Sequence, residues 1–556
     1  MTDKPQNAAQ ANLGLSGAQP SSGEALDAQE NWWRTAVIYL IYTRSYADSN
    51  GDGIGDIQGV IAKLDYLSWL GVGAIWLTPV TPSPNDDFGY DVSDYFGVEP
   101  QLGTMDDVEL LIAESHARGI RVIFDIVPNH TSDRHQWFVE SRSSRDNQRR
   151  DWYVWADSAA TGGPPNNWVD HTGRSAWEWD ARTEQWYLHN FLVSQPDLNW
   201  WNEGVCQQFD EIFGFWFAKG VDGFRIDVTQ GLIKDSELRD NPPADDTDHP
   251  DVAARGQKYV YNLNRPERHE ILRRWRALAR EYSPERLLYG ESYVFDIPSL
   301  AHCYGNDDEC HLGLNVPFLL SSWSAPALSA VVAQCEKVLP SSAWPCWTMS
   351  TQDESRFTTR WCGNNPQAAR CALMMLLTLR GTPILYYGDE LAMPDTEVPE
   401  ALMTDRMANP PVRISRDFER TPMQWSSGSG GGFCEAGVVP WLPFGELDTC
   451  NVESQRADPD SALHLCRELI QLRAASPALH SGPYRALPSP DGAWVYLRGS
   501  EFAVALNMSE HDVEAACPDG KVVISTLRSH DGRVVDGGAT MLSPYEGIVL
   551  AVAETS

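Results

Sequence analysis

The most informative segment of this chain reads Gly223-Phe-Arg-Ile-Asp-Val228. It has the apolar, β-branched composition of a buried strand and ends on a carboxylate. Because side chains alternate along a strand, Arg225 and Asp227 point to the same face. Three other segments place a carboxylate at or just beyond an expected strand end; they read Asp125-Ile-Val-Pro-Asn-His130, Tyr289-Gly-Glu-Ser292 and Ser350-Thr-Gln-Asp-Glu-Ser-Arg356. A single such residue is usually a helix cap or an ion-pair partner, whereas four in order predict one shared site.

The segments on either side of this one alternate between short strand-like runs and longer runs of helical period. Residues 57–70 and 105–118 are the clearest expected helices. Eight strands are expected, at residues 37–42, 73–78, 121–126, 221–227, 287–291, 312–316, 346–350 and 383–387. Eight strands separated by helices are what a parallel (β/α)8 TIM barrel requires, although periodicity alone also fits an open doubly wound sheet.

Two segments break this alternation and predict additional domains. Residues 131–200 follow the third strand directly, are rich in Trp, Asn, Asp and Gly, and indicate a loop-rich subdomain inserted in a βα loop. After about Pro477 strand-like runs replace helices, at 493–497, 502–507, 522–525 and 547–552, which predicts a C-terminal all-β domain of sandwich type. The expected organisation is a disordered tail (1–30), a barrel in two parts (31–130 and 201–477), the insert (131–200) and the C-terminal domain (478–556).

Composition excludes several classes of function. The chain carries 43 Lys and Arg against 77 Asp and Glu, a formal charge of −34, which disfavours binding to nucleic acid and to anionic membrane surfaces. No apolar run approaches the ~20 residues of a membrane span, and the first 30 residues lack the apolar core of a secretory signal. The eleven cysteines are odd in number and scattered, which favours reduced thiols and a cytoplasmic protein.

At the four strand-end motifs the sequence resembles the α-amylase superfamily of glycoside hydrolases. The resemblance runs from Trp32 to the C-terminus, and two segments are similar to the second and eighth strands of the family, Gly71-Val-Gly-Ala-Ile-Trp-Leu-Thr-Pro79 and Gly381-Thr-Pro-Ile-Leu-Tyr-Tyr-Gly-Asp-Glu390. Two others resemble signatures of its oligo-1,6-glucosidase and exo-α-glucosidase branch, Gln195-Pro-Asp-Leu-Asn199 and Arg416-Asp-Phe-Glu-Arg-Thr-Pro-Met-Gln-Trp425.

This resemblance implies a retaining, exo-acting α-glycosidase. Its substrate would be a small oligosaccharide or α-glucoside, from which it removes the sugar at the non-reducing end. A transglycosylase or sugar isomerase has the same catalytic residues and remains the alternative. A non-catalytic relative that serves as a transporter subunit fits less well, because such relatives have lost the carboxylates and carry a membrane span.

The resemblance also assigns catalytic roles. Asp227 corresponds to the nucleophile, Glu291 to the general acid/base, and Asp353 to a third carboxylate that binds sugar hydroxyls. Retention requires two carboxyls ~5 Å apart on opposite sides of the anomeric carbon. Arg225, on the same face as Asp227, is expected to keep that carboxylate ionised at neutral pH.

Residues of the sugar subsite follow from the same resemblance. Tyr90 would stack on the sugar, and Asp87 would accept a hydrogen bond from its 4-hydroxyl. Either Arg416 or Arg420 would complete this clamp, which leaves no room for a further sugar and therefore implies exo action. His130 would contact the 6-hydroxyl side, with a structural histidine as the alternative.

Three positions bear on substrate choice. The family has His where this chain has Gln352, and Phe where our alignment places Thr172. Both are expected to line the pocket, so the resemblance implies a changed sugar or acceptor preference. Val228, directly after the nucleophile, is a residue that the family associates with tolerance of α-1,6 links.

A metal loop is also visible near the N-terminus. The segment Asp48-Ser-Asn-Gly-Asp-Gly-Ile-Gly-Asp56 places oxygen ligands at alternate positions, as in the first part of a calcium-binding loop. The expected ligands of a structural Ca²⁺ (or Mg²⁺) are Asp48, Asn50, Asp52, Asp56 and the carbonyl of Ile54. A metal-free Asx turn is the alternative. No organic cofactor is expected.

Overall fold

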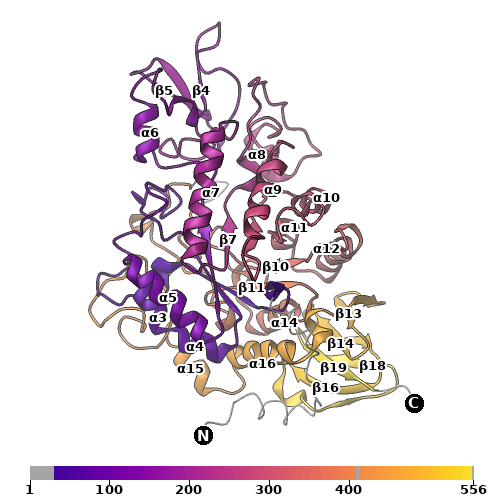
Figure 1. Cartoon of the computed structure of the whole chain (residues 1–556). Helices are drawn as coiled ribbons and strands as arrows, with labels where there is room; N and C mark the ends of the chain where they lie inside the picture. The colour runs from indigo at the N-terminus through magenta and orange to yellow at the C-terminus, as the bar shows by residue number, and fades with distance from the viewer. Residues whose placement is uncertain (1–29, 409–413, 554–556) are drawn as a thin grey trace.

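The computed structural model describes residues 30–408 and 414–553 of the 556-residue chain (Figure 1). The expected disordered tail therefore lies outside the described residues, except for Glu30. At the centre is a sheet of eight parallel strands, in the spatial order β10-β11-β1-β2-β3-β7-β8-β9. They are β1 (Ile38–Ile41), β2 (Ala74–Leu77), β3 (Arg121–Ile126), β7 (Gly223–Ile226), β8 (Leu287–Gly290), β9 (Leu312–Gly313), β10 (Cys346–Thr348) and β11 (Thr382–Tyr386). All eight expected strands are present, and the (β/α)8 barrel is confirmed.

The register of the central strands brings the strand-end motifs to one rim. β3 and β7 pair Asp125 with Arg225, and β7 and β8 pair Arg225 with Tyr289. Asp227 and Glu291 each come directly after the last residue of their strand. In a parallel barrel the carboxyl ends of all strands face the same way, so these side chains share the C-terminal rim.

The barrel helices pack around the sheet with their apolar faces inward. The longer ones are α5 (Met105–Ala117), α7 (Glu203–Ala218), α9 (Arg268–Ala279), α12 (Ala325–Val338), α14 (Pro366–Thr378) and α16 (Ala462–Ala475). The shorter ones are α3 (Ile57–Ala62), α4 (Leu64–Leu70), α8 (Pro250–Arg255), α10 (Ile297–Ala301), α11 (Val316–Leu319), α13 (Phe357–Arg360), α15 (Val452–Ala457) and α17 (Pro477–His480). The prediction of one continuous helix over 57–70 is wrong, because the helix is interrupted at Lys63. The ammonium group of Lys63 lies 4.2 Å from the Trp425 ring centroid.

The insert after β3 has its own small core. α6 (Gln136–Ser141) accompanies a three-stranded antiparallel sheet of β4 (Trp155–Ala156), β6 (Gln185–Leu188) and β5 (Trp177–Asp180). Trp168, Trp177 and Leu188 are buried together in it. This subdomain lies at the top of the molecule in Figure 1, above α7.

The C-terminal strands form a six-stranded antiparallel sheet and a two-stranded one. The first has the order β12 (Tyr484–Leu487), β13 (Ala493–Arg498), β14 (Phe502–Asn507), β19 (Gly547–Val552), β16 (Gly520–Ser525) and β17 (Val534–Val535). The second pairs β15 (Val513–Ala516) with β18 (Ala539–Leu542). Apolar side chains from both sheets, such as Val495, Ala515 and Leu550, share one buried cluster. α14 packs between the barrel and β14 and β19, and all its residues from Cys371 to Thr378 are buried.

Two observations concern the environment of the protein. Across the described ranges, no helix combines the length and apolar character that crossing a bilayer requires. All eleven cysteines lie in the described part of the chain as free thiols, and all but Cys450 are buried.

Candidate active site

A cavity of about 660 Å³ opens at the C-terminal rim of the barrel. Seven of the sequence-predicted site residues line it: Asp87, Tyr90, His130, Asp227, Glu291, Asp353 and Arg416. They come from the segments after β2, β3, β7, β8 and β10 and from the segment before α15. The barrel therefore gathers residues that are more than 300 positions apart in the sequence, such as Asp87 and Arg416, whose charged groups lie 2.7 Å apart.

Arg225 holds three carboxylates at the floor of the cavity. Its Nη1 atom lies 2.9 Å from Asp125 Oδ1 and 2.6 Å from Asp227 Oδ1, and its Nη2 atom lies 2.6 Å from Glu291 Oε1. The guanidinium is rigid, planar and only 2% exposed, so the two carboxylates that it binds through different nitrogens are fixed close to each other. Asp227 and Glu291 therefore converge on one guanidinium.

The backbone turns sharply after Asp227. Val228 adopts the left-handed conformation, with φ 50° and ψ 48°, which is costly for a β-branched residue. This turn directs its N–H to Glu291 Oε2, at 3.0 Å. The strained residue thus gives the second oxygen of Glu291 a fixed donor, while the first oxygen is held by Arg225.

The electrostatic balance at Asp227 differs from the expectation. Burial raises the pKa of the Asp227 carboxyl well above its ordinary value, Arg225 lowers it, and Glu291, Asp125 and Asp353 raise it further. Burial also raises the pKa of Asp125 to about 6 against the lowering effect of Arg225. The influence of Arg225 has the predicted sign, but desolvation and three neighbouring carboxylates outweigh it.

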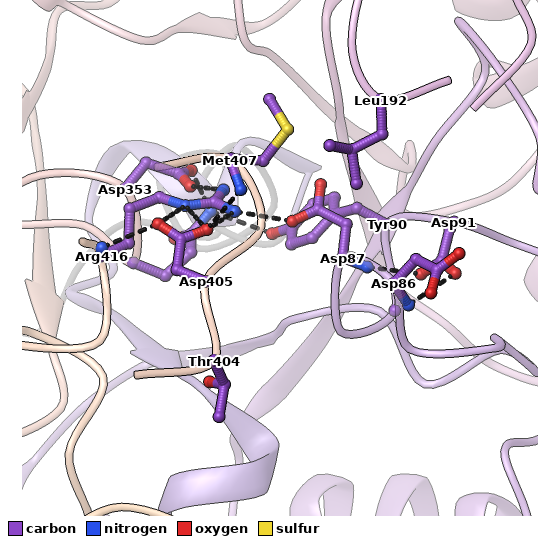
Figure 2. Close-up of polar contacts among 12 residues, drawn as sticks. Asp86, Asp87, Tyr90, Asp91, Leu192, Asp353, Thr404, Asp405, Met407 and Arg416 are labelled. Atoms are coloured by element: carbon purple, nitrogen blue, oxygen red, sulfur yellow. Dashed lines mark hydrogen bonds and ion pairs between the residues drawn. The ribbon is translucent and has the colours of Figure 1, made fainter. Parts of the chain in front are cut away.

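A second cluster closes the cavity around Arg416 (Figure 2). Its Nη2 atom lies 2.7 Å from Asp87 Oδ1 and 2.6 Å from Asp405 Oδ1, and its Nη1 atom lies 3.0 Å from Asp353 Oδ1. Asp405 was not predicted, because no motif marks it. Although burial alone would raise it, the pKa of Asp405 is held well below its usual range by Arg416 and Arg420.

Arg420 lies behind this cluster. It is fully buried, donates from Nε to the backbone oxygen of Gln352 at 2.6 Å, and pairs with Asp353 at 3.0 Å. Its guanidinium also lies 5.2 Å from the Tyr42 ring centroid. Of the two arginines that the signature left open, Arg416 therefore pairs with Asp87 and faces the cavity, and Arg420 fixes Asp353 from the other side.

Gln352 does not line the cavity, contrary to expectation. It is 1% exposed, and its Nε2 group donates to the Tyr90 hydroxyl and to Asp353 Oδ2, both at 2.9 Å. Tyr90 in turn donates to Asp125 Oδ2 at 2.8 Å. The amide therefore acts from behind, as a bridge that holds the tyrosine and the carboxylate in position.

Thr172 is also absent from the described lining of the cavity. Its hydroxyl donates to Asp170 Oδ1 at 2.7 Å, an oxygen that also accepts from the backbone N–H groups of Thr172 and Arg174. These hydrogen bonds hold the Thr172 hydroxyl against Asp170 of the same loop. The wall is formed instead by Asp170, His171 and Phe191, whose ring lies 5.7 Å from that of His171 in a stacked arrangement. Phe191 lies outside the segment around Thr172, and no motif of the sequence marks it.

His130 lies on the lining, and both its ring nitrogens are engaged by the protein. Nε2 is 3.0 Å from the Tyr90 backbone oxygen, and Nδ1 is 3.1 Å from the Asn129 amide. Burial lowers its pKa, so the ring is neutral and donates from Nε2 to the carbonyl. Gln195, from the family signature, lies beside it and donates to Asp87 Oδ2 at 3.1 Å.

The expected metal loop is a series of Asx turns. Asp48, Asn50 and Asp52 each accept from backbone N–H groups two to five residues ahead, Ile54 N–H donates to Asp52, and Asp56 caps α3 through Gly59 N–H. Within the described ranges, no three Asp, Glu, His or Cys side chains are grouped as a metal site. The N–H bonds leave lone pairs on each carboxylate, so the donor chemistry is compatible with a hard cation.

Comparisons with known proteins find related sequences and structures along most of the chain. The family model "Alpha amylase, catalytic domain" matches residues 40–482. A probable alpha-glucosidase of Rhizobium meliloti is 39% identical to this chain, over 93% of this chain and 98% of its own length. An oligo-1,6-glucosidase of Heyndrickxia coagulans is 35% identical over 93% and 99% of the two lengths. The crystal structure of an alpha-glucosyl transfer enzyme, XgtA, superposes with a TM-score of 0.88 at 37% identity, covering 94% of this chain and 99% of that one.

Proposed function

Because this chain belongs to the alpha-amylase catalytic-domain family, we propose that it is a retaining, exo-acting α-glucosidase of small α-glucosides. The observation that carries this proposal is the Arg225 cluster, in which Asp227 and Glu291 face one cavity from a single guanidinium. Double displacement needs two carboxyls on either side of one anomeric carbon, and this pair is held at one cavity by the same guanidinium.

The reaction follows from the positions of these groups. Asp227 attacks the anomeric carbon, and Glu291 gives its proton to the glycosidic oxygen as the bond to the leaving group breaks. A covalent glycosyl-enzyme forms on Asp227. Glu291 then takes a proton from water, which attacks the same carbon, releases the sugar with its configuration retained and frees Asp227. Arg225 stabilises both carboxylates whenever they are charged.

The Arg416 cluster accounts for exo action in this proposal. Asp87, Asp353 and Arg416 present charged groups to the end of the cavity, where they would bind the hydroxyls of a terminal sugar. Asp405 and Arg420 neutralise and fix this set from behind. A chain that continued beyond that sugar would displace Asp87 from Arg416, so short substrates are favoured.

Removing either catalytic carboxyl should abolish turnover. Asp227→Asn and Glu291→Gln are each expected to lower kcat on 4-nitrophenyl α-glucoside by about 10³-fold or more. The first removes the nucleophile and the second removes the general acid/base. Asp248→Asn is the matched control, since Asp248 lines the same cavity and pairs with Lys258. Proton NMR of early wild-type product should show the α-anomer; initial release of the β-anomer would exclude the proposed mechanism.

The pH profile should report the raised pKa of Asp227. Asp227 attacks only as a carboxylate, so kcat/KM is expected to fall as the pH drops through a value above about 3.9, the ordinary Asp value. Asp125 raises that pKa, and Asp125→Asn should therefore move the acidic limb to lower pH even if the rate falls. A limb that stays in place or moves to higher pH in this variant would contradict the assignment.

Glucosyl transfer is the second candidate, favoured by the similarity to XgtA, a solved alpha-glucosyl transfer enzyme. The same glycosyl-enzyme would form, and a sugar or alcohol hydroxyl would replace water in the second step. Chromatography of products at high substrate concentration separates the two. Free glucose alone supports hydrolysis, and new glucosides that accumulate ahead of free glucose support transfer.

We also propose that the loop at residues 48–56 binds a structural Ca²⁺ through Asp48, Asn50, Asp52, Asp56 and the Ile54 carbonyl. The alternating oxygens of its sequence support this, since hard cations take such ligands. Ca²⁺ should raise the midpoint of thermal unfolding of chelator-treated enzyme, and Asp52→Ala should remove the increase. Enzyme whose midpoint is the same with and without Ca²⁺ would contradict the site.

A further inference from the structure

The cavity extends past Glu291 to a wall of residues that take no part in the proposed reaction. This wall, here called the α9 wall, is formed by the segment after β7, the first turn of α9 and the segment after β8; it consists of Gln230, Asn264, Arg268, His269, Val294 and His302. On the segment after β8, Ser292 follows Glu291 directly, and its hydroxyl lies 3.0 Å from Sγ of Cys303, the residue next to His302.

The α9 wall lies where the leaving group must be. The terminal sugar is bounded on one side by Asp87 and Arg416, and Glu291 protonates the oxygen on its other side. The leaving group therefore extends from Glu291 away from the Arg416 cluster. Gln230 and Asn264, which join through a backbone hydrogen bond of 2.7 Å, place the start of α9 on this side.

Arg268 on this wall is a buried cation without an anionic partner. It is 4% exposed, and its Nη1 atom donates to the neutral Asn264 amide oxygen at 2.9 Å. In the described part of the chain no carboxylate lies within ion-pair distance of it, and its Nε–H has no acceptor. Burying an unpaired charge is costly, and proteins almost always pair it.

Most other charged groups of this region have partners, and Arg255, which is less buried than Arg268, lies 3.3 Å from His171 Nδ1. Asp296 accepts from the backbone and hydroxyl groups of Ser299, and His269 binds Glu309 at 2.6 Å. Lys258, another cation on the cavity lining, pairs with Asp245 at 2.8 Å and Asp248 at 3.3 Å. Of the arginines and lysines on the described lining, Arg268 and Arg416 are the buried ones, and Arg416 is paired with carboxylates whereas Arg268 is not.

The position of Arg268 in its helix adds to the positive potential. It is the first residue of the 12-residue helix α9, whose N-cap makes no side-chain hydrogen bond. A cation there is repelled by the helix dipole, and an anion there is attracted by both the dipole and the guanidinium. A guanidinium at a helix N-terminus therefore destabilises the folded protein, but the two positive groups together attract a negatively charged ligand.

We propose that Arg268 binds an anionic group, a carboxylate or a phosphate, on the leaving group of the substrate. This inference rests on the proposed α-glucosidase function and narrows its substrates to α-glucosides whose aglycone carries a negative charge. Arg268 is a specificity-determining residue here, because it contacts a part of the substrate that does not react.

The test compares aryl α-glucosides that differ in the para substituent of the aglycone, which is anionic in two of them and neutral in the third. The substrates are 4-carboxyphenyl, 4-phosphonophenyl and 4-carbamoylphenyl α-glucoside, of which the last is the neutral control. Wild-type enzyme should have a kcat/KM at least about tenfold higher for an anionic substrate than for the amide, the range of one charge-assisted hydrogen-bond pair. Whether the carboxylate or the phosphonate gains more distinguishes the two anions.

Substitutions identify the residue responsible. Arg268→Met should reduce the anionic-to-neutral ratio to about one, Arg268→Lys should keep part of it, and Lys258→Met, the matched control, should keep the wild-type ratio. A wild-type ratio of one or less overturns the inference, and so does a ratio that is unchanged in Arg268→Met. In either case, hydrolysis of the amide still supports the proposed function.

If none of the three glucosides is cleaved, the proposed function fails. If Arg268→Met does not fold, inhibition of the wild type by benzoate and benzamide decides, with stronger inhibition by benzoate expected and equal inhibition contradicting the inference.

Discussion

The site depends on one buried guanidinium, that of Arg225, which binds Asp125, Asp227 and Glu291 at 2.6–2.9 Å. Three carboxylates could not be gathered at the bottom of a cavity without it, since their mutual repulsion and desolvation would drive them apart or neutralise them. The barrel supplies the geometry. Adjacent parallel strands hold Asp125 beside Arg225, and the next strand delivers Glu291, so the cluster forms only when β3, β7 and β8 pair in register.

The Arg416 cluster has a similar design, with Arg416 among three carboxylates and Arg420 on the far side of one of them, Asp353. Its members come from distant segments, and Gln352 links it to the Arg225 cluster through Tyr90 and Asp353. Side-chain hydrogen bonds therefore link Asp353 of the Arg416 cluster, through Gln352 and Tyr90, to Asp125 of the Arg225 cluster. This continuity explains why Gln352 is buried behind the pocket rather than exposed in it.

Much of this could be predicted from the sequence, and the failures have physical causes. The eight strands and the rim carboxylates are local patterns, because a buried strand that ends on Asp or Glu is visible in a few residues. Asp405 could not be found, since its partner Arg416 lies eleven residues further along the chain and no local pattern links the two. Thr172 was placed wrongly because matching by sequence position ignores the Asp170 turn that binds its hydroxyl. The helix break at Lys63 has no local signal, and Lys63 contacts Trp425, which lies far along the chain.

The most direct test of the central claim is to trap the glycosyl-enzyme. Incubation with a fluorinated α-glucosyl fluoride, followed by proteolysis and mass spectrometry of the peptides, locates the covalently bound sugar. If Arg225 holds Asp227 and Glu291 on either side of one anomeric carbon, the label will be on Asp227, and it will persist longer in Glu291→Gln, which lacks the base that activates water. A label on another carboxylate, or inactivation without any covalent sugar, would contradict the account.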